Sequence, residues 1–247
     1  MAVTAIINIV LAAVIVICAW QGFKKGIIMG LVGVLVIILS LYGAQLLSDT
    51  FSYEVIPVLK PFVGGVLDSR VEDTAYEVLG YEPNENGEYI VSFSLTDLME
   101  RQPETREAIF LRVYQDLGLY DNLAEELARR AVDYANQNEA DVVTACTMVL
   151  CQAATWYGGT LLAFILIYAI LTVIVNLPNL SFRIPYIGIV NDLGGLAIGV
   201  YTGFLFCALI VWLFQFAGLL ITEDTLYSAG IAGYFLDKNM LAPYISF

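Results

Sequence analysis

Long apolar runs flank one long polar segment in this chain. Apolar residues dominate positions 3–20 and 27–47 and again 142–175 and 193–221, whereas 48–141 carries most of the charged side chains. An apolar run of about 18 residues or more is long enough to cross a bilayer as a helix. The pattern predicts an all-α membrane protein with four transmembrane helices, arranged as two helical hairpins.

The central polar segment predicts a small, mostly helical domain outside the bilayer. Residues 66–81 have a helical pattern, Pro103 marks a helix start, and Asp121 is expected to cap a further helix. Residues 88–95 alternate enough for a short strand or an extended piece. The segment carries seven Lys/Arg and twenty Asp/Glu, so it accounts for the whole net charge of −13. This acidic surface keeps a domain soluble and repels nucleic acid, which is not an expected partner.

Basic residues indicate which connections face the cytoplasm. Lys24 and Lys25 lie in the short loop after the first apolar run, and Arg183 lies in the connection before the fourth. Cytoplasmic loops are enriched in Lys and Arg, so both chain termini and the acidic domain are expected outside. The predicted divisions are a first transmembrane hairpin at 1–47, the acidic extracytoplasmic domain at 48–141, a second hairpin with a juxtamembrane helix at 142–221, and an extracytoplasmic tail helix at 222–247.

The third apolar region is too long for one straight span. Trp156 and Tyr157 followed by Gly158 and Gly159 divide it. One interpretation has residues after this point crossing the bilayer while those before it lie along the outer surface. The other is a single long tilted helix that projects from the bilayer, and the sequence leaves both open.

Glycines spaced by four residues mark two of the predicted spans. Within a bilayer, helices associate largely through close backbone approach at small residues, so we expect these glycines to pack helices together or to contribute to gating. Their similar positions also suggest two related hairpins, an arrangement known from transporters. The six glycines are Gly22, Gly26, Gly30, Gly195, Gly199 and Gly203.

The two hairpin sequences resemble the colicin V production protein family. The segment 22–26, Gly-Phe-Lys-Lys-Gly, is similar to its first signature, and Ile184-Pro-Tyr-Ile-Gly followed by Asn191 and the spaced glycines is similar to its second. Asp192 stands where the family usually has a basic residue. The resemblance covers about the first fifty and the last eighty residues. It implies a bacterial plasma or inner membrane protein linked to production or export of a small peptide toxin and to envelope resistance.

Few residues are candidates for ion contact, catalysis or metal binding. Asn191 and Asp192, at the cytoplasmic mouth of the fourth span, are candidates for a gate or an ion contact, although Asp192 also suits a simple helix cap. The chain has no histidine, and its four cysteines lie in apolar stretches without metal-binding or redox spacing. We therefore expect no enzyme activity, no metal and no cofactor.

Two functions fit the sequence. The first is a component of membrane permeation or of peptide or toxin export, in which the glycine-rich hairpins form the core of an oligomeric channel or transporter. The alternative is a non-conducting scaffold whose acidic outer domain recruits another envelope protein. In both, the expected partners are the lipid bilayer and either further copies of the chain or an envelope protein.

Overall fold

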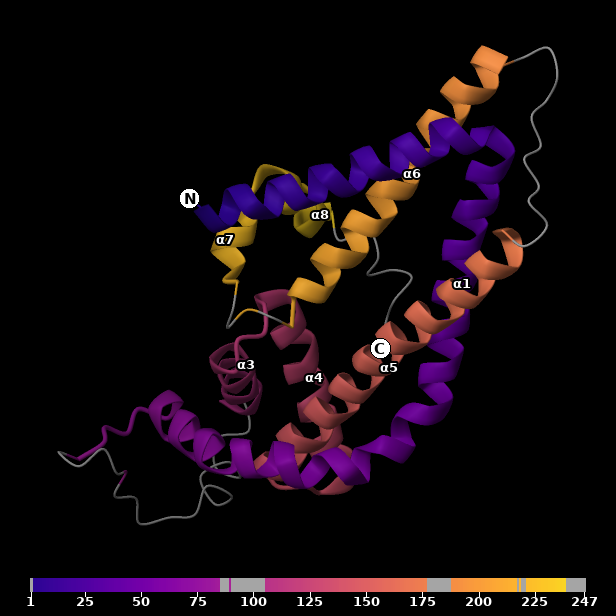
Figure 1. Ribbon diagram of the computed structural model, residues 1–247. Helices are drawn as coiled ribbons and strands as arrows, with labels where there is room; N and C mark the ends of the chain where they lie inside the picture. Colours follow the sequence, from indigo (N-terminus) through magenta and orange to yellow (C-terminus); the bar gives the residue numbers. More distant parts are fainter. Residues whose placement is uncertain are drawn as a thin grey trace. The chain divides into compact units, whose positions relative to one another are not determined.

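The described residues are helical throughout their regular structure. The computed structural model describes residues 2–84, 89, 105–176, 188–216, 218 and 221–238. Across these it contains α-helices and no strand. Arg183 and all but one residue of the predicted extended piece at 88–95 lie outside them. The helices are α1 (Ala2–Val78), α3 (Arg106–Asp116), α4 (Asp121–Asn138), α5 (Val142–Asn176), α6 (Gly188–Phe214), α7 (Glu223–Ser228) and α8 (Gly230–Lys238) (Figure 1).

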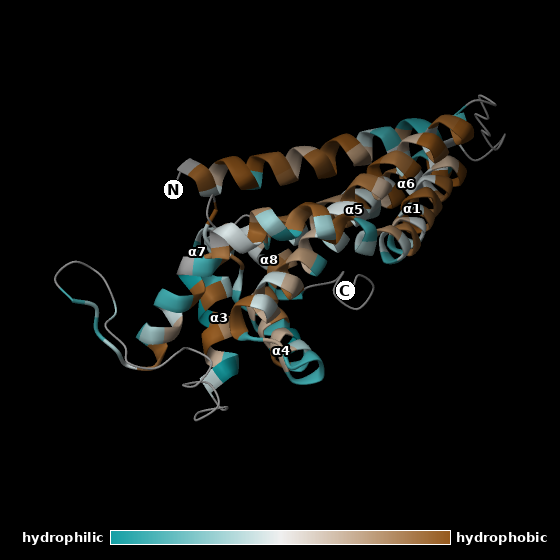
Figure 2. Ribbon diagram, turned by 90° about the horizontal axis from the view of Figure 1, so that it is seen from below, coloured by the Kyte–Doolittle hydropathy of each residue, from teal (hydrophilic) through white to brown (hydrophobic). Residues whose placement is uncertain are grey.

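Three of the described helices are long and apolar enough to cross a membrane. They are the Val3–Gly65 part of α1, with 63 residues, α5 with 35 residues and α6 with 27 residues. Most of their side chains face outward, and hydrophobic residues colour these helices brown in Figure 2. Exposed apolar surface on this scale suits a lipid environment and not water. The chain therefore has the character of a membrane protein.

Helix α1 is broken at one residue. Gly26 has φ 79° and ψ 177°, which no helix contains, and the chain changes direction there (Figure 1). We call residues 2–25 the first arm and residues 27–48 the second arm. The sequence suggested a short loop at this point. Instead the helix continues through Lys25, because one glycine with positive φ can make the whole turn.

The chain divides into two compact units. Unit 1 contains Met1–Ser48 and Gly158–Phe247, and unit 2 contains Asp49–Tyr157. Helix α5 is continuous through Trp156 to Gly159. Of the two interpretations of this region, the structure has the single long helix, because neighbouring turns keep these glycines helical.

Unit 2 has its own core. The hydroxyl of Tyr114, fully buried, donates a hydrogen bond to the carbonyl oxygen of Cys146 at 3.2 Å, which joins α3 to α5. Burial raises the pKa of Tyr114 well above its usual range, so this phenol stays neutral. Within the same unit, the indole Nε1 of Trp156 donates to the Asp49 carboxylate at 2.6 Å. These bonds hold helices that are distant in sequence.

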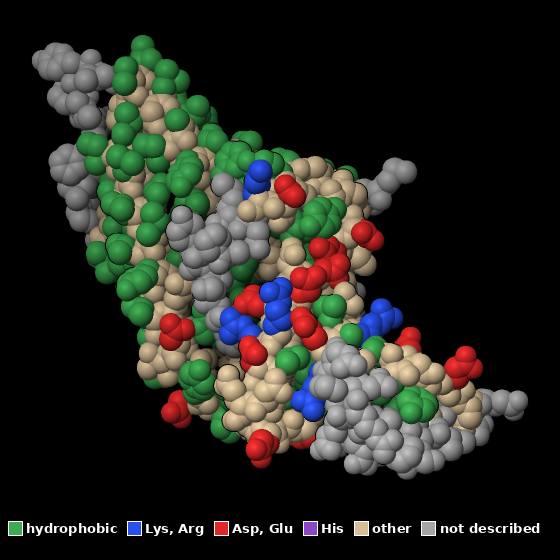
Figure 3. Space-filling view, turned by 180° about the vertical axis from the view of Figure 1, so that it is seen from behind, with side chains coloured by type: hydrophobic (Ala, Val, Ile, Leu, Met, Phe, Trp, Pro, Cys, Tyr) green, Lys and Arg blue, Asp and Glu red, His purple; other side chains and the backbone are tan. Residues whose placement is uncertain are grey.

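Helix α4 places its charges on the outside. Its apolar face is buried, and on its surface Arg129 pairs with Glu125 at 3.6 Å and Arg130 with Glu126 at 2.8 Å. Acidic and basic side chains lie side by side on the visible face in Figure 3. The expectation that Asp121 caps this helix is wrong: the cap position is Tyr120, and the Asp121 carboxylate instead accepts a hydrogen bond from Gln115 at 2.8 Å.

The core of unit 1 joins the second arm of α1 to α5 and α6. Ile37 and Ala44 of the second arm and Phe164 of α5 are buried together. The Tyr168 ring stacks on Phe164, with ring centroids 5.7 Å apart, and meets the edge of Phe206 from α6 at 5.6 Å. Aromatic pairs of this geometry add to the packing energy. The second arm is therefore held by both later apolar helices.

One disulfide tests the packing of the second arm on α5. A Cβ atom built on Gly159 lies 3.8 Å from the Cβ of Ser48, within the range that a disulfide requires. We expect Ser48→Cys with Gly159→Cys to cross-link on mild oxidation, measured as a loss of two thiols reactive to a polymer-bearing maleimide. Gly33→Cys with Gly159→Cys is the control and should not cross-link. A folded double-cysteine protein that keeps both thiols would contradict this packing.

Candidate functional site

The first arm of α1 and helix α6 pack backbone against backbone. Glycine lines both sides of the contact, and its members are all buried: Gly22, Gly26, Gly195, Gly199 and Gly203. With hydrogen in place of a side chain, the two backbones approach closely enough for extensive van der Waals contact, which is a principal source of helix association in lipid. We call this surface the glycine contact.

The closeness of the glycine contact excludes any larger residue. A Cβ atom added to Gly22 would lie 2.8 Å from the Cα of Gly199, and one added to Gly195 would lie 2.8 Å from the Cα of Gly26. At Gly203 the added atom would lie 2.8 Å from the Cα of Ile15. Separations below 3.0 Å are essentially never found for real Cβ atoms. Since the opposing atoms are backbone, no rotamer change can relieve the overlap.

The contact extends over the C-terminal half of the first arm, from Leu11 onward. Leu11 meets Cys207, Ile15 meets Gly203, Ala19 meets Gly199 and Gly22 meets Gly195. The residue numbers rise along the first arm while those of their partners fall along α6. The two helices are therefore antiparallel. The four-residue spacing seen in the sequence places one glycine on this line at each turn of α6.

Gly30 has a different environment from the other five predicted glycines. It is half-buried in the second arm, and an added Cβ would lie 3.1 Å from a methyl group of Ile198. A flexible side chain can move away where backbone cannot. Gly194 does not belong to the series of glycines spaced by four residues, and the side chain of Ile27 packs against it. The adjacent Gly194-Gly195 pair was the sequence signal for this second close approach.

Asn191 caps the second arm from another helix. Its side-chain Oδ1 accepts a hydrogen bond from the backbone N–H of Ile27 at 3.1 Å, and the residue is only 4% exposed. The break at Gly26 leaves the first N–H groups of the second arm without helical partners, which is costly in an apolar environment. Asn191 satisfies one of them directly. The side chain therefore connects α6 to the break.

Asp192 lies beside this cap, in the part of α6 that follows Gly188, and is half-buried. Its role as a gate, an ion contact or a helix cap stays a prediction. Lys24 and Lys25 are exposed just before the break, and the Lys24 ammonium lies 5.0 Å from the Trp20 ring centre. A tryptophan with a neighbouring lysine is typical of a membrane–water interface.

Removing the cap should destabilise the protein moderately. We expect Asn191→Ala to lower the free energy of unfolding by about 1 kcal/mol, the usual value for a lost N-cap. Asn191→Asp keeps an acceptor oxygen and should lose less. Denaturant titration in lipid bicelles measures both, with Asp192→Asn as the neighbouring control. Equal, negligible effects for all three substitutions would show that the hydrogen bond to Ile27 is not formed.

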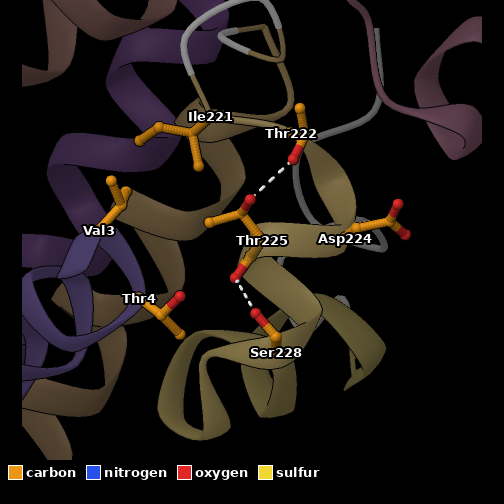
Figure 4. Close-up of a pocket in the computed structure, with 7 residues that line it drawn as sticks. All are labelled: Val3, Thr4, Ile221, Thr222, Asp224, Thr225 and Ser228. Atoms are coloured by element: carbon orange, nitrogen blue, oxygen red, sulfur yellow. Dashed lines mark hydrogen bonds between the residues drawn. The ribbon is translucent and has the colours of Figure 1, made fainter. Parts of the chain in front are cut away.

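A small hollow lies at the other end of the first arm. It has a volume of about 440 Å³ and a wall rich in hydroxyl groups (Figure 4). The Thr222 and Thr225 hydroxyls are 2.8 Å apart, and Ser228 donates to the carbonyl oxygen of Thr225 at 2.8 Å. In the described part of the chain, no group of three His, Cys, Asp or Glu side chains is placed to hold a metal ion. The residues lining the hollow are Val3, Thr4, Ile221, Thr222, Asp224, Thr225 and Ser228.

Comparison with known proteins does not assign the chain to a family. No family model matches it, and no curated protein or solved structure matches it. The resemblance to the colicin V production proteins therefore remains a prediction that rests on the two short segments described above.

Proposed function

We propose that this protein is a component of a membrane permeation or export system, with its moving part at the glycine contact. The observation that carries the proposal is the break at Gly26, capped from α6 by Asn191. Interrupted helices whose freed backbone groups are satisfied by other helices are common in transporters, at the places where the protein changes conformation.

The glycine contact is suited to a shift between two arrangements. Its opposing surfaces carry hydrogen atoms and not interlocked side chains, so one helix can slide over the other with few rotamer changes. The Asn191 hydrogen bond fixes one position of the break, and its release would free the second arm to reorient. Because the contact is closed backbone to backbone in one copy, a conducting path would form between several copies of the chain.

The proposed arrangement in the membrane has four spans. The first and second arms of α1 are two of them, with Lys24 and Lys25 on the cytoplasmic side by the positive-inside rule, and α5 and α6 are the others. Unit 2 and both termini would then be extracytoplasmic. The resemblance to the colicin V production proteins supports a bacterial plasma or inner membrane and a peptide cargo.

Flux through the purified protein in liposomes tests this function. We expect the wild type to pass monovalent cations or a short peptide faster than empty liposomes do, and Asn191→Ala to change the rate at least several-fold. Gly33→Ala is the matched control, because a Cβ at Gly33 meets nothing within 4 Å. Folded, correctly inserted wild-type protein with no flux would reject the proposal.

Unit 2 favours a second candidate, the scaffold. Its helix α4 presents a mixed charged face in which Glu125 and Arg129 are more than half exposed. A photo-reactive residue at position 129 should cross-link one recurrent envelope protein in intact cells, while one at Val16, in the apolar first arm, should not. This result together with absent flux would establish the scaffold in place of the transporter.

A further inference from the structure

We infer that helix α8 is re-entrant: it enters the apolar layer beside the first arm of α1 and does not lie on the outer surface as a tail. The sequence predicted a tail helix outside the membrane. The inference is argued from contacts within unit 1 and rests on the proposed arrangement, in which the first arm of α1 crosses the bilayer.

A hydrogen bond places the start of α8 below the membrane surface. The side-chain Oδ1 of Asn8 accepts from the backbone N–H of Ile231, the second residue of α8, at 3.1 Å. Asn8 lies five residues inside the apolar run that begins at Val3, which corresponds to about 8 Å along the helix. The first turn of α8 is therefore at that depth beside the first arm.

A ring contact places Phe235 of α8 beside α6. The Phe235 ring lies 5.5 Å from that of Phe204 in α6. Gly203, the neighbour of Phe204, packs against Ile15 of the first arm. Ile15 is about 18 Å along the helix from Val3, within an apolar run that extends about 27 Å. Helix α8 thus begins beside the outer part of the first arm and packs against α6 through Phe235.

The buried face of α8 suits this position, whereas its last two residues, Asp237 and Lys238, are charged and exposed and must face water and not lipid. The buried face is apolar, with Ala232, Gly233, Phe235 and Leu236. Gly233 lets α8 fold back closely on α7, because an added Cβ would lie 2.7 Å from the carbonyl oxygen of Tyr227. A half-helix inside lipid must also satisfy the N–H groups of its first turn.

Asn8 satisfies one of these groups, and this explains the amide side chain in the otherwise apolar 5–17 stretch. The bonding resembles that at the break in α1. In both places an asparagine on one apolar helix caps the start of another helical segment.

Spin labels on the full chain in liposomes measure the depth of α8. Tyr234 of α8 is 50% exposed, Tyr227 of α7 is 47% exposed and Val16, within the apolar run of the first arm, is 65% exposed, so each position accepts a label. Each is replaced by cysteine, and the unsubstituted protein supplies the background from the four native cysteines. The relaxation of each spin label is measured with oxygen, which concentrates in lipid, and separately with a water-soluble nickel chelate.

The nickel chelate should relax the label at Tyr234 much less than the label at Tyr227, and about as little as the label at Val16. Asn8→Ala should raise the nickel effect at Tyr234, because an unsatisfied Ile231 N–H is better solvated outside the layer, whereas Thr4→Ala should not. A nickel effect at Tyr234 equal to that at Tyr227, in otherwise native protein, would overturn the inference.

Discussion

Gly199→Leu should separate the first arm of α1 from α6. A Cβ atom at position 199 overlaps the carbonyl oxygen of Cys18 and lies 3.0 Å from the Cα of Ala19. Both are backbone atoms of the opposing helix, so the leucine fits only if the helices move apart. Overpacking of a core usually lowers the free energy of unfolding by about 1–3 kcal/mol. No change of rotamer can relieve the overlap here, so we expect a loss of about 3 kcal/mol or more.

The separation would also break contacts on either side of position 199. The cap that Asn191 provides lies two turns before it, and the Cys207 thiol, which donates to the Leu11 carbonyl oxygen at 3.5 Å, lies two turns after it. Denaturant unfolding in bicelles measures the loss of stability. Gly33→Leu introduces the same side chain where nothing lies within 4 Å and should leave stability nearly unchanged. Similar unfolding midpoints for the two variants would refute the glycine contact.

Apolar run length was sufficient to predict helices of membrane-spanning size, because length and hydropathy are local properties of the sequence. Glycine spacing identified residues that share a helix face for the same reason. What spacing could not show is which faces meet, and the antiparallel match of Gly22 and Gly26 with the glycines of α6 is known only from the fold. The roles of these residues in packing or gating remain predictions.

Several features depend on tertiary contacts that no local pattern contains. Helix α1 continues to Gly26 because a partner, Asn191, is available to satisfy the next N–H group. Helix α5 is continuous across Gly158 and Gly159, although isolated glycines weaken a helix. Asn8 appeared in the sequence only as a polar residue in an apolar run, and its bond to Ile231 gives it a structural role. For Gly26 and Asn8, the partner that decides the local structure is distant in sequence.

Gly26→Ala should be the second most damaging substitution, for a different physical reason. Its φ of 79° and ψ of 177° fall in a region that is essentially restricted to glycine, and forcing another residue there costs about 1–3 kcal/mol. The new methyl group would also lie 2.8 Å from Cγ of Asn191, the side chain that caps the second arm. Strain and displacement of the cap act together, so we expect a loss of about 3 kcal/mol in the free energy of unfolding.

A double-mutant cycle separates these two effects. Asn191→Ala removes the overlapping amide, so combining it with Gly26→Ala should cost less than the sum of the single changes, while the backbone strain remains. Gly33→Ala supplies the control for a glycine in a regular helix and should be neutral or slightly stabilising. If Gly26→Ala were as harmless as Gly33→Ala, the helix could not be broken at residue 26. If the two losses simply added, the Asn191 side chain would not lie against the break.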